Sequence, residues 1–174
     1  MGEFWVFGYG SLMWRPGFPF RTRAPALLSG YHRSLCVLSH VHRGTPERPG
    51  LVLGLDRGGR CKGIAFEVAA GDHEPTLAYL REREMANYVY REAMVPVRLL
   101  DGSGRVVRAL AYVVDRAHPQ YAGPRGLDDT VRLVAQGHGK SGPNPDYVHA
   151  THAALMDLGV VDRRLKAVVE RLGR

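Results

Sequence analysis

The stretch F-W-V-F-G-Y-G-S-L, from Phe4 to Leu12, joins an apolar run to a glycine-rich turn. The run Phe4–Phe7 predicts a buried strand, because it is apolar throughout and is bounded by turn-forming residues. Gly8 and Gly10 flank Tyr9 and let the backbone turn where side chains would clash. Such a turn can aim several backbone N–H groups at one point, which makes a site for an anion or an oxyanion. Taken alone, Gly-x-Gly more often indicates a simple hairpin turn with its tyrosine packed on the core.

Length and composition indicate one soluble domain spanning residues 1–174. Of the 174 residues, 45% are hydrophobic and 24% are charged, which is ordinary for a globular protein. No apolar run approaches the ~20 residues that a membrane-spanning helix needs. The N-terminus lacks the basic start and the long apolar segment of a secretory signal. We therefore expect a cytoplasmic protein that makes no membrane contact.

The charge balance favours an anionic partner. Lys and Arg number 24 against 17 Asp and Glu, a net charge of +7. The arginines are scattered along the chain, however, with no basic run, no interleaved aromatics and no helix-turn-helix pattern. We therefore expect a small acidic substrate and no nucleic acid. Cys36 and Cys61 fit neither a disulfide framework nor a zinc pattern, and both are expected to be buried thiols.

Periodicity predicts strands in the first two thirds of the chain and helices at the end. One helix begins at Asp72 among the strands, and Pro96 places its strand at an edge or at a bulge. Strands are expected at 4–7, 26–30, 33–39, 51–55, 61–68, 88–100 and 105–115, with hairpin loops at 56–60 and 101–104; later helices start near 127, 145 and 162. This order is typical of an α+β fold whose mixed or antiparallel sheet is curved into a barrel.

Glu84 breaks the apolar pattern of the helix that begins at Asp72. It recurs with Leu77 and Leu80 at helical spacing, so it shares their inward face, whereas Glu82 points to solvent. A carboxylate on an apolar stripe is either paired with an arginine or retained for chemistry. Spacing alone favours the ion pair and leaves both meanings open.

The segment from His40 to Gly50 reads H-V-H-R-G-T-P-E-R-P-G and predicts a surface loop. His40 and His42 have no third ligand nearby, so a solvent-facing pair is favoured over a metal site. Arg43 is either a solvated loop residue or a fork that grips a carboxylate. A later G-K-S, at residues 139–141, lacks the first glycine of a P-loop and its flanking strand and helix, so we exclude a nucleotide site.

Together the motifs resemble the ChaC-type γ-glutamylcyclotransferases. The resemblance rests on segments in the family's order between about Phe4 and about Leu158: F-G-Y-G-S-L-M-W-R-P-G-F, H-R-G-T-P-E-R-P-G, Y-L-R-E-R-E-M-A-N-Y and H-G-K-S-G-P-N-P-D-Y. It implies a γ-glutamylcyclotransferase-like fold, a small mixed β-barrel with flanking helices. It also implies a reaction without metal or other cofactor, in which a γ-glutamyl compound, typically glutathione, gives 5-oxoproline and cysteinylglycine.

The resemblance also assigns residues. The family's turn falls on Tyr9, Gly10, Ser11 and Leu12, which would hold the γ-glutamyl group, and its catalytic glutamate falls on Glu84 as general acid/base. The chain departs from the family in reading R-E-R-E, so Glu82 also follows an arginine; the inward face favours Glu84. The family's downstream tyrosine corresponds to Tyr88, and Arg43 would hold a carboxylate of the substrate.

Two alternatives remain at this stage. The enzyme could cyclise another γ-glutamyl amine or amino acid, because the sequence does not define the pocket for the leaving group. The net charge of +7 also fits a non-catalytic module that binds an acidic metabolite or nucleic acid. The complete set of motifs favours the glutathione enzyme over both.

Overall fold

The computed structural model describes residues 2–173 and divides the chain into two compact units. The first contains the chain up to residue 33 together with residues 55–115. The second contains residues 34–54 and the chain from residue 116 onward. Two long strands, β2 (Thr22–Ser39) and β3 (Gly50–Val68), contribute residues to both units.

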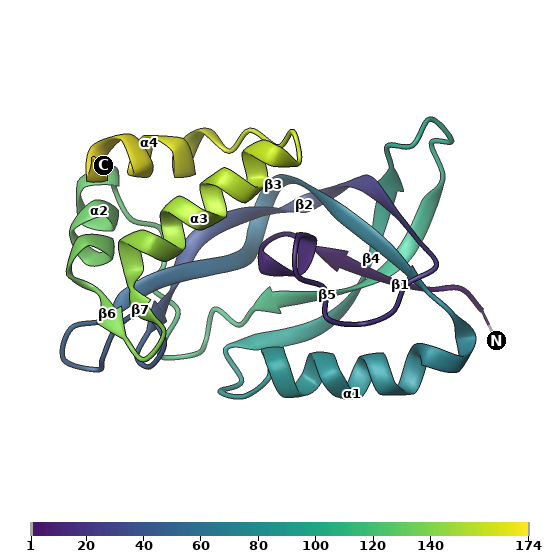
Figure 1. Ribbon diagram of the computed structural model, residues 1–174, viewed down its shortest axis with the longest axis horizontal. Coiled ribbons are helices and arrows are strands. Elements are labelled where there is room, and N and C mark those ends of the chain that lie inside the picture. The colour runs from purple at the N-terminus through teal and green to yellow at the C-terminus, as the bar shows by residue number, and fades with distance from the viewer. Residues whose placement is uncertain (1, 174) are drawn as a thin grey trace. The chain divides into compact units, whose positions relative to one another are not determined.

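The strands form a closed barrel in the order β1-β3-β2-β4-β5 (Figure 1). The first strand, β1 (Phe4–Gly8), pairs antiparallel with β3 and parallel with β5 (Val106–Val114). The predicted hairpin is present, with β4 (Tyr90–Leu99) antiparallel to β5. The expectation of an α+β fold with a mixed sheet curved into a barrel is therefore confirmed.

Strand β1 carries the apolar run into the core. Trp5, Val6 and Phe7 are all buried, as the sequence predicts for this run. The end of β1 needs a glycine on its neighbour β3, because a Cβ on Gly63 would lie 2.3 Å from the carbonyl oxygen of Gly8. This close approach explains the glycine inside an otherwise apolar strand.

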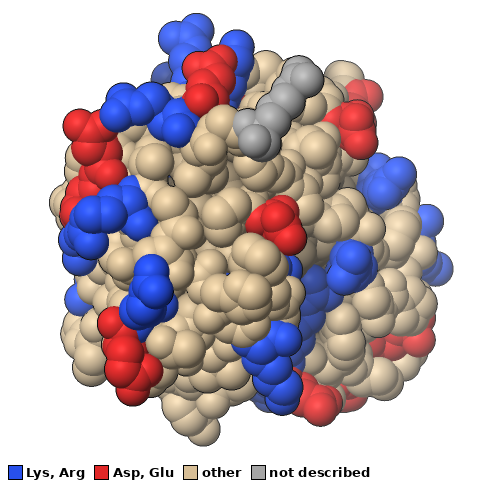
Figure 2. Space-filling model, turned by 60° about the vertical axis from the view of Figure 1, so that its left-hand side comes forward, with Lys and Arg blue, Asp and Glu red and all other residues tan. Residues whose placement is uncertain are grey.

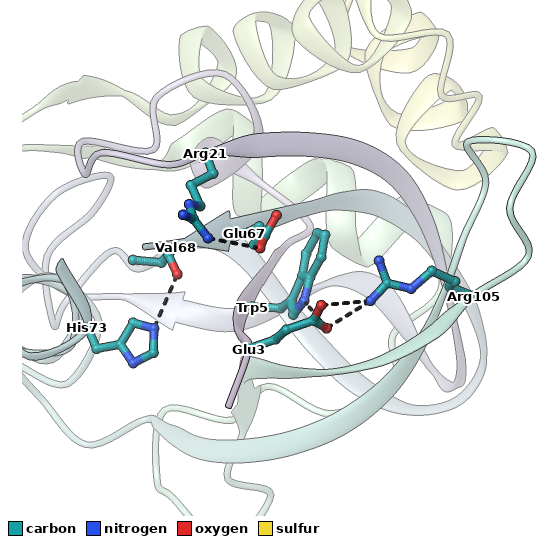
Figure 3. Close-up of polar contacts among 7 residues, drawn as sticks. All are labelled: Glu3, Trp5, Arg21, Glu67, Val68, His73 and Arg105. Carbon is teal, nitrogen blue, oxygen red and sulfur yellow. Dashed lines mark hydrogen bonds and ion pairs between the residues drawn. The ribbon is translucent and has the colours of Figure 1, made fainter. Parts of the chain in front are cut away.

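Polar contacts fasten the start of β1 (Figure 3). Arg105 donates from Nη2 to both carboxylate oxygens of Glu3 at 2.9 Å, and the Trp5 indole donates to the same carboxylate at 3.3 Å. Near the start of α1, the His73 ring donates from Nε2 to the Val68 carbonyl at 3.2 Å. Because Glu3 and Arg105 are exposed, their ion pair adds little to stability.

The helix α1 (His73–Glu84) follows a single 3-10 turn, η2 (Ala70–Asp72). Asp72 occupies the predicted N-cap position, although its side chain accepts no capping hydrogen bond. Thr76 and Leu80 are buried, Glu82 is exposed and Glu84 is mostly covered. Leu80 and Glu84 thus lie on the covered side as the periodicity predicts, whereas Leu77 is half-buried and Thr76 takes the buried position beside it.

The predicted break within each long strand is wrong. Residues 26–30 and 33–39 belong to the single strand β2, and residues 51–55 and 61–68 belong to the single strand β3, with no hairpin at 56–60. The glycines at or beside these predicted breaks have positive φ: Gly30 (92°), Gly58 (99°) and Gly59 (69°). The strands continue through these glycines without reversing, and His32 Nδ1 of β2 lies 2.9 Å from the Gly58 carbonyl oxygen of β3.

Pro96 lies where β4 has a partner on one side. It pairs with Arg108 of β5, whereas the pairing of β4 with β2 covers Val97–Leu99. A proline has no N–H for a second neighbour, so its position matches the predicted local edge.

The second unit holds the remaining helices, α2 (Leu127–Gln136), α3 (Asn144–Asp157) and α4 (Arg163–Leu172), which contact one another in pairs (Figure 1). A short hairpin, β6 (His138–Gly139) with β7 (Gly142–Pro143), joins α2 to α3. Asp162 caps α4 as predicted, accepting from the Leu165 N–H at 2.9 Å. The helix predictions for this part of the chain are confirmed.

The surface carries charges of both signs. On the face drawn in Figure 2, basic and acidic side chains both occur among neutral ones. Within residues 2–173, no helix has the length and apolarity to cross a bilayer. Cys36 and Cys61 are buried, as expected.

Candidate active site

The glycine turn leads into a short 3-10 helix, η1 (Ser11–Met13), and not into a hairpin. The Gly10 carbonyl accepts from the Met13 N–H at 2.9 Å, and the Ser11 carbonyl accepts from the Arg15 N–H at 2.8 Å. Among the described residues, the backbone N–H groups of Gly10, Ser11 and Leu12 have no hydrogen-bond acceptor. Because Leu12 and Met13 are buried, the turn is anchored while these donors remain available for an anionic ligand.

A buried arginine supports the turn from the barrel side. Arg33 of β2 is 9% exposed, and it donates from Nε to the Tyr9 carbonyl at 2.5 Å and from Nη2 to the Lys62 carbonyl at 2.8 Å. Tyr9 is itself buried, as a core-packed tyrosine would be. The turn is therefore held in place by the packing of Tyr9 and by a charge-assisted hydrogen bond from Arg33.

Glu84 is the last residue of α1, and its side chain is 18% exposed. Within the described chain its carboxylate accepts no hydrogen bond; its polar contact is an ion pair with Arg83, with Nε and Oε1 3.4 Å apart. Burial raises the pKa of Glu84 above its usual value, against the opposing effect of the Arg83 charge. Glu84 is therefore ion-paired and desolvated at once, and desolvation has the larger effect on its pKa.

Arg83 links the turn to Glu84. Besides the ion pair, its Nη2 donates to the Ser11 hydroxyl at 2.8 Å. Ser11 and Glu84 are therefore separated by a single guanidinium group. The residue pattern assigned Arg83 no role of its own, although it stands directly before the predicted catalytic glutamate.

A second polar cluster lies on the β4–β5 hairpin. Glu92 accepts from the Tyr112 hydroxyl at 3.2 Å and from Arg81 of α1 at 2.7 Å and 3.1 Å. Burial and the charge of Glu92 raise the pKa of Tyr112, and the charge of Glu84 adds to this effect. The Tyr112 hydroxyl is therefore within electrostatic reach of Glu84. The alternation of apolar and polar residues in these strands did not predict this cluster, because the register of the hairpin places Glu92 opposite Tyr112.

Tyr88 is not brought to Glu84 by any contact among the described residues. It is 71% exposed and has a φ of 57°, the left-handed region that a tyrosine rarely adopts. Its backbone N–H donates to the Met85 carbonyl at 3.3 Å, within the loop that follows α1.

Arg43 belongs to the second unit. Its Nη1 donates to the Pro143 carbonyl at 3.1 Å, and its guanidinium lies over the Tyr147 ring, 5.6 Å from the centroid. The Arg43 backbone N–H donates to the Ser39 hydroxyl at 2.9 Å. The arginine is thus held inside the loop system of residues 39–50 and 137–147.

Close backbone packing explains the glycines of that loop system. A Cβ on Gly137 would lie 2.4 Å from the Arg43 carbonyl oxygen, and one on Gly50 would lie 2.3 Å from the same atom. The buried Asn144 side chain pairs with both backbone groups of Leu51, at 2.8 Å and 2.9 Å. The segment H-G-K-S-G-P-N, residues 138–144, is therefore held through Asn144 against the start of β3 at residues 50–51.

The G-K-S segment has its N–H groups engaged. Lys140 donates to the Val41 carbonyl at 2.7 Å and Ser141 donates to the His42 carbonyl at 2.9 Å, so neither is available to a phosphate. The His42 ring lies 2.8 Å from the Ser141 hydroxyl through Nδ1. Over residues 2–173, no group of three or more His, Cys, Asp and Glu side chains could hold a metal ion.

Comparison with known proteins gives these features a family. The sequence model of the ChaC-like protein family matches residues 4–174. The chain belongs to the ChaC-like family. It is 35% identical over 161 residues to the glutathione-specific γ-glutamylcyclotransferase of Escherichia coli K12, covering 92% of this chain and 69% of that one. It is 32% identical to γ-glutamylcyclotransferase 2-3 of Arabidopsis thaliana, over 92% and 84% of the two chains.

The fold of this ChaC-like chain also has a close counterpart among solved structures. A crystal structure of a yeast γ-glutamyl cyclotransferase specific to glutathione superposes with a TM-score of 0.86, covering 99% of this chain and 96% of that one. At 24% identity this likeness supports the fold, and it confirms the expected γ-glutamylcyclotransferase-like architecture.

Proposed function

We propose that the protein is a glutathione-specific γ-glutamylcyclotransferase in which Glu84 acts as general acid/base. The observation that carries the proposal is the juxtaposition of Glu84, on the buried face of α1, with the Gly10–Leu12 turn through Arg83. Membership of the ChaC-like family and the names of its relatives support glutathione as the substrate. The products are 5-oxoproline and cysteinylglycine.

The reaction needs the substrate to fold back on itself. The α-amine of the γ-glutamyl group attacks its own γ-carbonyl carbon, a five-membered ring closes, and the bond to the cysteine nitrogen breaks. An intramolecular attack avoids the entropy of bringing two molecules together, and effective molarities reach ~10⁵–10⁸ M when the geometry is correct. The protein therefore has to hold a bent conformer of the substrate.

Proton transfer is the task of Glu84. The α-amine is mostly protonated at neutral pH and cannot attack in that form, so a base must remove a proton. A carboxylate whose pKa is raised by burial is a better base than an exposed one, and it can return the proton to the departing nitrogen. One residue thus serves in both halves of the reaction.

The turn supplies hydrogen-bond donors. The N–H groups of Gly10, Ser11 and Leu12 are suited to the substrate's α-carboxylate or to the oxyanion that forms at the γ-carbonyl. In this proposal Tyr9 shapes the turn, Tyr88 contacts the substrate from the loop after α1, and Arg43 holds a carboxylate of the substrate.

Replacing each glutamate of R-E-R-E separately tests the assignment. Glu84→Gln keeps the size of the side chain but removes its basicity, so we expect 5-oxoproline formation from glutathione to fall by about 10²–10⁴-fold. Glu82→Gln, two positions earlier on the exposed face, is the matched control and should retain wild-type turnover. Wild-type turnover by Glu84→Gln, with its circular dichroism unchanged, would reject Glu84 as the acid/base.

A substrate panel separates glutathione from other γ-glutamyl amines. The ring-forming half is common to all of these compounds, so only the pocket for the leaving group can discriminate among them. We expect the kcat/KM for glutathione to exceed that for simple γ-glutamyl amino acids. Equal values across the panel would leave the cyclisation in place and remove the specificity for glutathione.

A further inference from the structure

Arg83 makes more polar contacts than an ion-pair partner of Glu84 needs. Its side chain is 21% exposed, and its nitrogens reach acceptors on separate segments of the first unit. These acceptors are Glu84 Oε1 (3.4 Å from Nε), the Ser11 hydroxyl (2.8 Å from Nη2), and, from Nη1, the Arg15 carbonyl (2.7 Å), the Tyr79 hydroxyl (3.0 Å) and the Pro16 carbonyl (3.3 Å). Only arginine carries this many donors in a rigid plane.

We propose that Arg83 is a positioning residue, which holds the Gly10–Leu12 turn and the Glu84 carboxylate at a fixed separation for the cyclisation. The inference rests on the proposed function and adds to it a residue whose part is to position other groups. Arg83 acts through its neighbours on both sides.

The hydrogen bonds of Arg83, which together we call the Arg83 clamp, also hold the segment that follows the turn. Residues 14–21 lie between η1 and β2 outside any helix or strand, so hydrogen bonds to their backbone fix their course. Arg83 supplies bonds to two successive carbonyls there, those of Arg15 and Pro16. Arg83 therefore ties this segment to the end of α1.

Gly17 gives independent evidence that the loop is packed closely around the Arg83 contacts. Its φ is +76°, and a Cβ there would lie 2.1 Å from the Tyr79 hydroxyl, the same hydroxyl that accepts from Arg83. The loop therefore packs directly against the Arg83–Tyr79 pair. A glycine is required because any side chain would displace that hydroxyl.

The hydrogen-bonding geometry of Arg83 and its positive charge lead to two separate predictions. A misplacement of about 1 Å in the catalytic geometry can cost ~10²-fold in rate. Loss of the planar, forked set of N–H donors of the Arg83 guanidinium should therefore lower kcat. The positive charge of Arg83 also opposes the effect of burial on Glu84, so its loss should raise the pKa of that carboxyl further. Less of the base form would then be present at a given pH, and the acidic limb of the rate profile would move to higher pH.

The test compares Arg83→Met and Arg83→Lys with Arg81→Met. Arg81 lies on the same helix and pairs with Glu92. Within residues 2–173 its side chain has no hydrogen bond or ion pair with the turn or with Glu84, which makes it a matched control. Rates of 5-oxoproline formation from glutathione are measured over a range of pH, alongside thermal unfolding. We expect Arg83→Met to lose about 10²-fold in kcat/KM and to shift its acidic limb upward. Arg83→Lys should lose rate with a smaller shift, and Arg81→Met should resemble the wild type.

The outcomes separate the two proposals. Wild-type protein that forms no 5-oxoproline from any γ-glutamyl compound overturns the proposed function and the role of Arg83 with it. Active wild-type protein with an unaltered rate and acidic limb in Arg83→Met overturns the role of Arg83 alone. If Arg83→Met does not fold, Arg83→Lys decides, because it keeps the charge but lacks the fork; a wild-type kcat in that variant rejects the clamp.

Discussion

At the scale of single residues, the proposed acid/base role of Glu84 depends on a balance between burial and charge at its carboxyl. Burial raises the pKa of its carboxyl and Arg83 lowers it, with burial the larger effect. The Arg83 charge favours the ionised form of Glu84, whereas burial makes that form a stronger base than an exposed carboxylate would be. The arginine beside the glutamate therefore keeps the base form accessible.

This balance predicts a pH-dependent stability difference. The pKa of Glu84 is raised above 4.5 in the folded protein, so the folded state binds more protons than the unfolded state through that range. The stability contribution of the group is then fully present below the unfolded value and is lost as the pH rises through the folded value. We expect the unfolding free energy of Glu84→Gln minus that of the wild type to increase from acidic to neutral pH.

Urea unfolding at several pH values measures that difference. Glu82→Gln, at an exposed position, should show little change with pH relative to the wild type. A difference for Glu84→Gln that shrinks as the pH rises would mean that the ion pair with Arg83 outweighs burial.

Gly17 offers a second test at the residue scale. Gly17→Ala places a Cβ against the Tyr79 hydroxyl in a left-handed backbone conformation, so we expect a loss of stability above the ~1–2 kcal/mol of the backbone strain, and lower activity. Gly104 has a similar φ of +65° with nothing within 4 Å of a Cβ. Gly104→Ala should therefore show the backbone cost alone, with unchanged activity. Equal effects of the two variants on activity would contradict the link between Gly17 and Arg83.

At the scale of elements, helix α1 carries an unsatisfied polar group on the face that it shares with Glu84. The Thr76 hydroxyl is buried and has no hydrogen-bond partner in the described part of the chain. Thr130 of α2 is equally buried, but its hydroxyl donates to the Gly126 carbonyl at 2.9 Å. These two threonines make a natural comparison of a satisfied and an unsatisfied hydroxyl.

We expect Thr76→Val to stabilise the protein and Thr130→Val to destabilise it, each by about 1 kcal/mol. The first substitution removes a polar group that gains nothing from burial, whereas the second leaves the Gly126 carbonyl without this donor. Chemical denaturation of both variants measures the effects. A loss of stability in Thr76→Val as large as in Thr130→Val would show that the Thr76 hydroxyl is satisfied.

Helices and strands differed in how well the sequence predicted them. The inward position of Leu80 and Glu84 on α1, the cap of α4 at Asp162 and the hairpin of β4 with β5 follow from local patterns and are confirmed. The interruptions predicted in β2 and β3 are wrong, because glycines such as Gly58 can lie within a strand as well as end it. The residues around a glycine do not show whether the strand continues or ends there, because pairing with the neighbouring strand decides it.

At the scale of the whole molecule, the α+β class and the curved sheet follow from the order of elements, and the architecture follows from the resemblance to a family. The sequence could not predict which side chains meet. Arg33 beneath Tyr9 and Arg83 beside Ser11 each join residues far apart along the chain. Such contacts depend on barrel closure and strand register, which no local pattern encodes.

The reaction class is the central claim, and the fate of the γ-carbonyl carbon tests it most directly. Purified wild-type protein and Glu84→Gln are incubated with glutathione in water enriched in the heavy oxygen isotope, and the products are identified by mass spectrometry. Cyclisation uses no water, so we predict unlabelled 5-oxoproline and cysteinylglycine from the wild type and a large loss of both in Glu84→Gln. Glutamate that carries the heavy isotope would show hydrolysis by water and would contradict the account.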